Sequence, residues 1–276
     1  MSVRLHPIRA GEIQLDVISP RPPRRGPAKL PRTLLRSFAR KAQWYPVPLF
    51  LVEHASGPFL IDTGYDPSIS SDPTRTLGFF FGKVAMKHRL VDPSTREQVL
   101  SRGVDPAEIS RVVMTHLHND HTSGADQWPG ATFITTREER DAAAGFGPYV
   151  KSHIATIKSW QEIDYSSGEA EPFESFSRTV DLFGDGEVRL ISSPGHSAGH
   201  QSALLRLRDR YALICGDSCM SSAELRETLI DGVIVDQGSY LRSGNEAREF
   251  MGTHPDAIAI PSHDRELWSR LEATYD

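Results

Sequence analysis

The residues best suited to chemistry lie in one short run of the chain, Thr115-His116-Leu117-His118-Asn119-Asp120-His121. Imidazole nitrogen and carboxylate oxygen are zinc ligands, and a catalytic zinc site leaves one position open for water. His116 and His118 are two residues apart, so in extended backbone their side chains leave the same face and can bind one ion. Asp120 and His121 follow where the chain must turn, which can direct them to a second ion. A solvated histidine-rich loop is the alternative, but three of the 11 histidines within six positions favour a metal site.

Three more residues that can ligate a metal each come just after an apolar run that predicts a strand. Taken singly, each is more typical of a capped turn or a satisfied polar group. Together with the histidine-rich run they form a pattern in which four strand ends supply ligands. The three stand in Ser193-Pro194-Gly195-His196, Cys215-Gly216-Asp217 and Pro261-Ser262-His263-Asp264.

The elements that must position these residues follow from hydrophobic periodicity and turn residues. Ser94 and Glu97 form a capping-box pattern, which predicts a helix that ends at Gly103. Strands interleaved with helices in this order predict a layered α/β fold. Strands are expected at 48–54 and 58–62 as one hairpin, at 111–115, 131–135, 188–191 and 257–260, and at 201–207 and 210–214 as a second hairpin; helices are expected at 137–144, 149–160 and 245–252.

These motifs resemble the metallo-β-lactamase superfamily, whose signature is a His-X-His-X-Asp-His loop followed by a distant His, an Asp and a last His. The segment Phe59-Leu60-Ile61-Asp62-Thr63-Gly64 is similar to the Asp-Thr-Gly segment of that family, so the resemblance runs from about residue 46 to about residue 265. It implies a four-layer αββα sandwich with metals at one edge, between the two sheets.

The resemblance also implies two Zn²⁺ ions, with Fe, Co or Mn as other candidate metals. Asp217 would bridge both ions, and Asp62 would orient ligands without touching a metal. One zinc would be held by His116, His118 and His196, and the other by Asp120, His121 and His263.

The chemistry expected of such a centre is hydrolysis. Metal coordination lowers the pKa of water from 15.7 to about 7, so a hydroxide that bridges two zincs can attack a carbonyl or phosphoryl centre at neutral pH. Asp120 would orient the hydroxide and carry a proton to the leaving group. Segments 46–54 and 61–64 are most similar to N-acyl homoserine lactone lactonases, which implies opening of a lactone with a hydrophobic acyl arm, a quorum-quenching activity.

One position departs from those lactonases. They commonly carry a tyrosine three residues after the bridging aspartate, where this chain has Met220, which cannot donate a hydrogen bond to an oxyanion. Tyr65 or Tyr240 could replace that donor. Phe79 and Phe80 could line a pocket for the acyl arm, although aromatic residues in a loop more often cover a core.

Three other functions are compatible with the motif. A phosphodiesterase, phosphotriesterase or arylesterase could use the same metals. An iron-dependent oxygenase or diiron oxidoreductase fits less well, because diiron relatives place glutamate where His118 stands and no flavin domain is appended. A binding protein that has lost catalysis is disfavoured because no ligand position is missing.

Composition predicts a single enzyme domain over residues 1–276, with a basic extension around 21–45. The chain is 38% hydrophobic and 24% charged, near the globular average. Its net charge of -5 argues against nucleic acid as a partner, and no run approaches the ~18 to 20 apolar residues of a membrane span. The first residues lack the apolar core of a signal peptide, so a cytoplasmic location is expected. The expected partner is a small-molecule substrate. The basic extension could be a lid, the arm of a homodimer or a patch for an anionic group, but its composition is more typical of a solvated surface segment.

Overall fold

The structure is a computed structural model that describes residues 3–15, 22–23, 43–69, 71–72, 87–230 and 234–276. Most of the basic extension lies outside these residues, as do Phe79 and Phe80, so the roles expected of them stay predictions.

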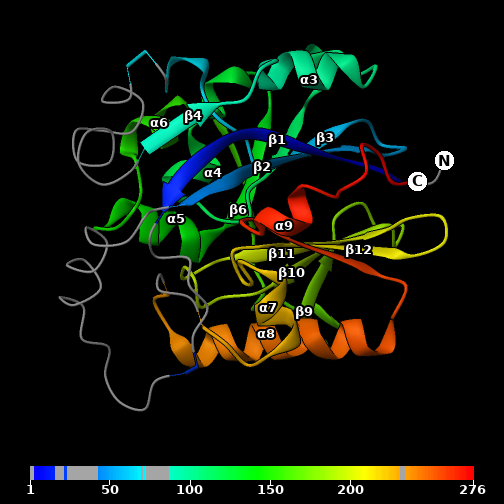
Figure 1. Cartoon of the computed structure of the whole chain (residues 1–276). Helices are drawn as coiled ribbons and strands as arrows, with labels where there is room; N and C mark the ends of the chain where they lie inside the picture. The colour runs from blue at the N-terminus through cyan, green and yellow to red at the C-terminus, as the bar shows by residue number, and fades with distance from the viewer. Residues whose placement is uncertain (1–2, 16–21, 24–42, 70, 73–86, 231–233) are drawn as a thin grey trace.

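Two β-sheets lie face to face between helices, which makes four layers (Figure 1). The seven-stranded sheet has the order β4-β1-β2-β3-β5-β6-β7, and the six-stranded sheet has the order β13-β12-β11-β10-β9-β8. The strands are β1 (Arg4–Leu15), β2 (Gln43–Glu53), β3 (Phe59–Ile61), β4 (Lys87–Leu90), β5 (Arg111–Val113), β6 (Thr132–Thr136), β7 (Ser159–Ile163), β8 (Glu171–Phe173), β9 (Phe176–Asp181), β10 (Val188–Ser192), β11 (Gln201–Arg206), β12 (Tyr211–Gly216) and β13 (Ile258–Pro261).

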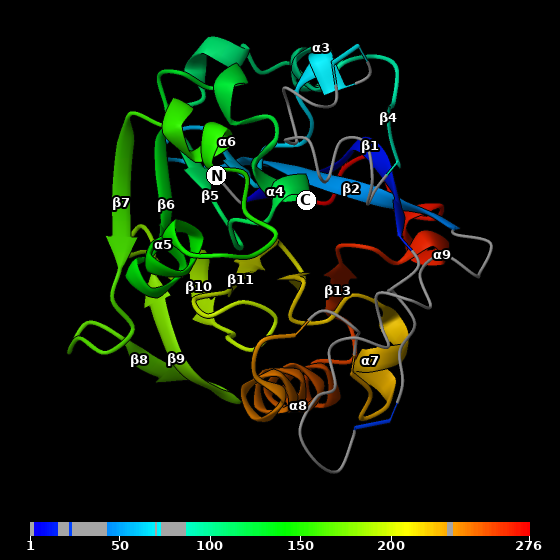
Figure 2. The same ribbon diagram turned by 90° about the vertical axis from the view of Figure 1, so that its left-hand side faces the viewer.

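Helices cover the outer faces of both sheets, which confirms the expected αββα sandwich. Figure 1 shows α3 over the first sheet and α8 along the second, and Figure 2 shows α5 beside β6. None of the helices in the described ranges has the length and apolar composition to cross a membrane. The α-helices are α3 (Thr95–Ser101), α4 (Asn119–Thr122), α5 (Arg137–Ala144), α6 (Lys151–Thr156), α7 (Ser222–Arg226), α8 (Gln237–Thr253) and α9 (Arg265–Trp268), and the 3-10 turns are η1 (Pro67–Ile69), η3 (Pro106–Glu108) and η4 (Ala125–Gln127).

Strand β2 shows how the core is built. Adjacent residues of a strand point to opposite faces, so Phe50 and Val52 pack between the two sheets, whereas Leu49 and Leu51 pack outward in a cluster with Val99 of α3. All four β2 residues are at most 1% exposed. Burial of each such side chain contributes about 1.5–3 kcal/mol, which holds the first sheet between two apolar layers.

Most of the expected elements are confirmed. Strands β2 and β3 pair antiparallel, as do β11 and β12. Helix α5 spans the expected residues, and Ser94 and Glu97 form the expected capping box at the start of α3.

Two expected helices were wrong in extent. Only Lys151–Thr156 of the segment 149–160 is helical, and Ser159–Ile163 pairs parallel with β6 as strand β7. The ladder to β6 outweighs the weak local preference for helix. Helix α8 begins at Gln237, well before residue 245, because the Asp236 side chain caps it by accepting the Ser239 N–H.

Candidate metal centre

The histidine-rich loop begins at the end of β5, where the end of β3 supports it. The Asp62 N–H donates to Val113 O at 2.8 Å, and the Thr115 N–H donates to Asp62 Oδ1 at 2.8 Å. Asp62 has a φ of 60°, in the left-handed region that is uncommon for a residue other than glycine. This turn buries the Asp62 carboxylate completely against the loop.

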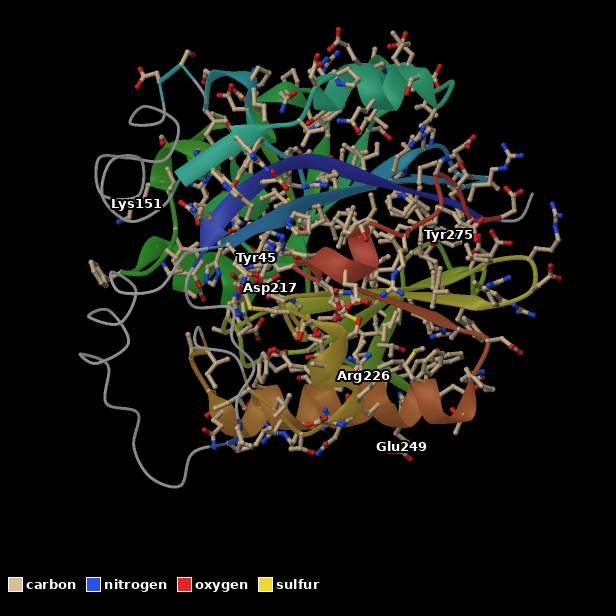
Figure 3. The ribbon with its side chains drawn as sticks, viewed as in Figure 1. Tyr45, Lys151, Asp217, Arg226, Glu249 and Tyr275 are labelled. Carbon is tan, nitrogen blue, oxygen red and sulfur yellow. The ribbon has the colours of Figure 1, made fainter. Side chains whose placement is uncertain are left out.

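The seven side chains predicted to be ligands converge at one edge of the two sheets, near the ends of β5, β10, β12 and β13. Figure 3 shows Asp217 between the sheets, and none of the seven residues is more than 7% exposed. Their ligand atoms lie within 4.8 Å of one another in three overlapping groups: His116, His118 and His196; His116, His121 and Asp217; and Asp120, His121 and His263.

Asp217 is the centre of this arrangement. Its Oδ2 lies 3.3 Å from Nε2 of His196 and 3.4 Å from Nε2 of His263. The same oxygen is 3.9 Å from Nε2 of His116, and Oδ1 is 3.4 Å from Nε2 of His121. One carboxylate therefore faces imidazoles from both sides, as a ligand shared by two ions would.

The ligand atoms lack the partners that buried polar atoms need. Among the described residues, Nε2 of His116, His121 and His263 and Oδ1 of Asp217 are buried without a hydrogen-bond partner. Each buried polar atom left unsatisfied costs about 1–3 kcal/mol. Imidazole and carboxylate are the donors that zinc and similar divalent metals prefer, so these residues fit a pair of such ions.

The protonation of the rings suits metal binding on one side of the centre. Burial and the neighbouring imidazoles lower the pKa of His116 and His118 well below the ordinary value, so both rings are neutral and offer lone pairs. Burial lowers the pKa of His121, but Asp62 and Asp217 outweigh it and raise that pKa well above the ordinary value. For the Asp217 carboxyl, burial acts to raise the pKa, but the imidazoles of His263, His196 and His121 outweigh burial and hold this pKa well below its usual range.

Hydrogen bonds at Nδ1 orient the rings of His121 and His263. Nδ1 of His121 lies 2.7 Å from Asp62 Oδ2, and Nδ1 of His263 lies 2.9 Å from Pro46 O. A carboxylate or carbonyl oxygen can only accept here, so Nδ1 carries the proton in both rings and Nε2 faces the centre. Metal-binding histidines are commonly fixed in this way.

Asp62→Asn tests that orientation. The amide keeps the size of the carboxylate but is a weaker acceptor for the His121 proton. We expect zinc affinity, measured by competition with a chelator, to fall about 10–100-fold, the usual cost of losing such an outer partner. Asp105→Asn, at the exposed N-cap of η3, is the matched control and should leave affinity unchanged. Equal affinities in the two variants would contradict the role given to Asp62.

His200 is a buried residue of the centre that the sequence did not indicate. Its Nε2 accepts the Asp217 N–H at 2.9 Å, and its Nδ1 lies 2.8 Å from Ser193 Oγ. Because Nε2 accepts, the ring proton is on Nδ1. Gly216 has a φ of 57°, and a Cβ there would lie 2.6 Å from the His200 ring, so glycine is needed for this close approach. The only signal in the sequence is the spacing of four from His196.

The described residues expected to contact substrate are all buried. Tyr65 and Met220 pack in one apolar cluster. The Tyr65 hydroxyl lies 2.7 Å from His88 Nδ1, and the Tyr240 hydroxyl donates to Glu224 Oε2 at 2.6 Å. Neither of these partners is a predicted metal ligand, so a role for either tyrosine in binding substrate stays a prediction.

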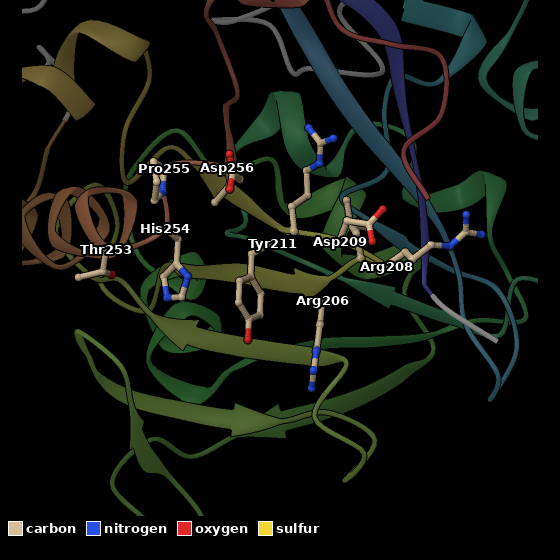
Figure 4. Close-up of a pocket in the computed structure, with 11 residues that line it drawn as sticks. Arg206, Arg208, Asp209, Tyr211, Thr253, His254, Pro255 and Asp256 are labelled. Atoms are coloured by element: carbon tan, nitrogen blue, oxygen red, sulfur yellow. The ribbon is translucent and has the colours of Figure 1, made fainter.

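A separate hollow of about 350 Å³ lies at the turn between β11 and β12 and at the end of α8 (Figure 4). Arg206 and Arg208 line it, but the figure shows their side chains pointing in different directions. Both are exposed. Because these charges do not converge, the hollow offers no defined site for an anion. None of the predicted metal ligands lines it, so we assign it no role in the reaction.

His54, Asp185 and Glu187 form another group with the spacing of metal ligands. The Ser56 N–H donates to Nδ1 of His54 at 3.0 Å. This bond leaves the proton of a neutral ring on Nε2, which faces Asp185 Oδ2 at 3.0 Å. A protonated nitrogen cannot ligate a metal, so we assign no metal to this group.

Comparisons with known proteins agree with this geometry. The chain matches the family model of the metallo-beta-lactamase superfamily over residues 42–263. The N-acyl homoserine lactonase AttM of Agrobacterium fabrum is 30% identical over 236 residues, which cover 82% of this chain and 85% of the relative. AttM of Rhizobium johnstonii is 31% identical with the same coverage. A solved structure of an N-acyl homoserine lactone hydrolase with the product N-hexanoyl-L-homoserine at its catalytic metal centre has a TM-score of 0.75 at 22% identity, and the match covers 99% of this chain and 98% of that one.

Proposed function

The chain belongs to the metallo-β-lactamase superfamily and is a metal-dependent hydrolase, and we propose that it is a lactonase that opens N-acyl homoserine lactones. The observation that carries the proposal is the set of buried ligand atoms without partners that four strand ends bring together. Curated relatives named as lactonases support the choice of substrate.

We assign the ligands to two divalent metals, with zinc as the first candidate. Such a pair, when bound, lowers the pKa of water and polarises the carbonyl group of a substrate. Asp217 lies between the two groups and would touch both ions. The groups are His116, His118 and His196 for one ion and Asp120, His121 and His263 for the other.

Asp120 is suited to move a proton during the reaction. It is the most exposed of the seven residues, at 7%, and its Oδ2 lies 3.6 Å from Nε2 of His263. In lactone hydrolysis the oxygen of water bonds to the acyl carbon, the ring C–O bond breaks, and the ring oxygen must gain a proton. The Asp120 carboxylate can accept a proton from water and deliver it to that oxygen.

An apolar cluster beside the centre suits the hydrophobic arm of the substrate. The His263 N–H donates to Met220 O at 3.3 Å, which joins the centre to this cluster. Met220 packs there with Ile13, Val47 and Tyr65. We propose that the apolar acyl arm of the substrate lies on the side of the centre that this cluster supports.

A panel of substrates tests the proposal. Zinc-loaded protein should open N-acyl homoserine lactones of several chain lengths and act more slowly on aryl esters, phosphodiesters and phosphotriesters. Ring opening is followed by proton release, and the metal content of each sample is measured. Faster turnover of a phosphodiester with no lactone opening would reject the lactonase, and oxygen uptake by iron-loaded protein would favour oxidation.

Met220→Tyr probes the departure from the lactonase pattern. If a lactone is the substrate, the added hydroxyl can donate to the developing oxyanion, and we expect lactone turnover to be unchanged or to rise, by at most about 10²-fold. Met220→Leu, which changes packing without adding a donor, is the control. A large drop in Met220→Tyr with full metal content would indicate that Met220 packs against a different substrate.

A further inference from the structure

Glu139 is a completely buried carboxylate in the first turn of α5, outside the set of predicted ligands. Its Oε1 accepts the Leu117 N–H at 2.9 Å, and its Oε2 accepts the Gly199 N–H at 3.0 Å. Leu117 stands between His116 and His118, and Gly199 is three residues after His196. One side chain therefore joins the two loops that carry this group of three histidines.

A second contact ties the same loop to the same helix. Thr136, the N-cap of α5, accepts the Glu139 N–H at 3.1 Å and donates its hydroxyl to Gly199 O at 2.9 Å. A Cβ at Gly199 would lie 2.0 Å from Thr136 Oγ1. Both polar backbone atoms of Gly199 are thus bound by the start of α5, and only glycine allows so close an approach.

We propose that Glu139 is a positioning residue, which sets the distance between the His116–His118 loop and the His196 loop and so prepares their three imidazoles for one metal. The proposal rests on the metal-dependent function proposed above. The other group, Asp120, His121 and His263, is oriented by different partners, Asp62 and Pro46. Loss of Glu139 should therefore weaken metal binding at His116, His118 and His196 more than at Asp120, His121 and His263.

The need for a carboxylate follows from the two donors. An ionised carboxylate only accepts, so its two oxygens can take both backbone N–H groups. A glutamine has the same size but turns an NH₂ group toward one of these donors. Burial raises the pKa of the Glu139 carboxyl, and hydrogen bonds that include those from the Leu117 and Gly199 N–H groups oppose this rise.

Glu139→Gln with zinc titration tests the proposal without any substrate. Two binding steps are expected for the unaltered protein, and in Glu139→Gln one step should weaken about 10–100-fold while the other changes little. Glu138→Gln removes the same charge from the adjacent, exposed position of α5 and should bind as the unaltered protein does. Two unchanged steps in Glu139→Gln, or two equally weakened steps, would overturn the proposal.

A second pair of variants decides the matter if Glu139→Gln does not fold. Thr136→Val removes the hydroxyl bound to Gly199 O, whereas Thr136→Ser keeps it. We expect the same single binding step to weaken in Thr136→Val and to be restored in Thr136→Ser. Identical binding by the two variants would overturn the proposal. A failure of lactone turnover alone would count against the proposed function and not against Glu139, because these titrations do not use a substrate.

Discussion

Replacing His118 with alanine is expected to abolish hydrolysis and to remove metal from its group. His118 is 4% exposed, and its Nδ1 faces Nε2 of His196 at 2.9 Å. Without this ring the ion would keep His116, His196 and the shared Asp217, so it would lose one of its four proposed protein ligands. Activity should fall by more than about 10²-fold, since the loss of a residue that only hydrogen-bonds a metal ligand can already reduce activity by that factor. Metal content by elemental analysis and hydrolysis at fixed free zinc check the prediction.

His6→Ala is the matched control for His118→Ala. His6 is also buried, at 3% exposed, but its ring nitrogens contact Thr274 and Glu53 and no predicted ligand. It should keep its metals and its activity. Two bound metals with full activity in His118→Ala would rule out the assignment of this group.

Asp217→Asn is expected to produce the second large loss. The Asp217 carboxylate lies between both groups, within 3.3–3.9 Å of four imidazoles. The amide has the same shape but no negative charge to balance the two proposed dications, and its NH₂ group would face lone pairs of the rings. We expect zinc affinity to fall by about 10²-fold or more, which exceeds the usual effect of losing a residue that only hydrogen-bonds a metal ligand. Activity should be lost in parallel. Titration calorimetry with zinc measures the affinity.

Asp209→Asn, in the exposed turn between β11 and β12, makes the same charge change far from the centre and should bind zinc normally. Full occupancy and normal affinity in Asp217→Asn would mean that the carboxylate does not bridge the ions. Reduced affinity in both variants would indicate an effect of net charge alone.

Local elements were predictable because their signals act over a few residues. The Ser94 capping box was visible from the spacing to Glu97, and helix α5 was predicted at its observed bounds. Strand β7 was not, because its residues 159–163 show little periodicity and are extended by pairing with β6. The long strand β1 was also not indicated by the sequence, and it lies between β2 and β4, whose residues are distant in the chain.

The sequence by itself determined the types of the proposed ligands and their order, because imidazole and carboxylate side chains at strand ends carry their chemistry wherever the chain places them. The tertiary structure alone decided which nitrogen of His121 and of His263 faces the centre, since Asp62 follows β3 and Pro46 lies in β2. It also decided the roles of His200 and Glu139, because Asp217 lies 17 residues from His200 and Gly199 lies 60 residues from Glu139 in the chain. A hydrogen bond depends on distance and angle in space, and spacing along the chain does not specify either for residues so far apart.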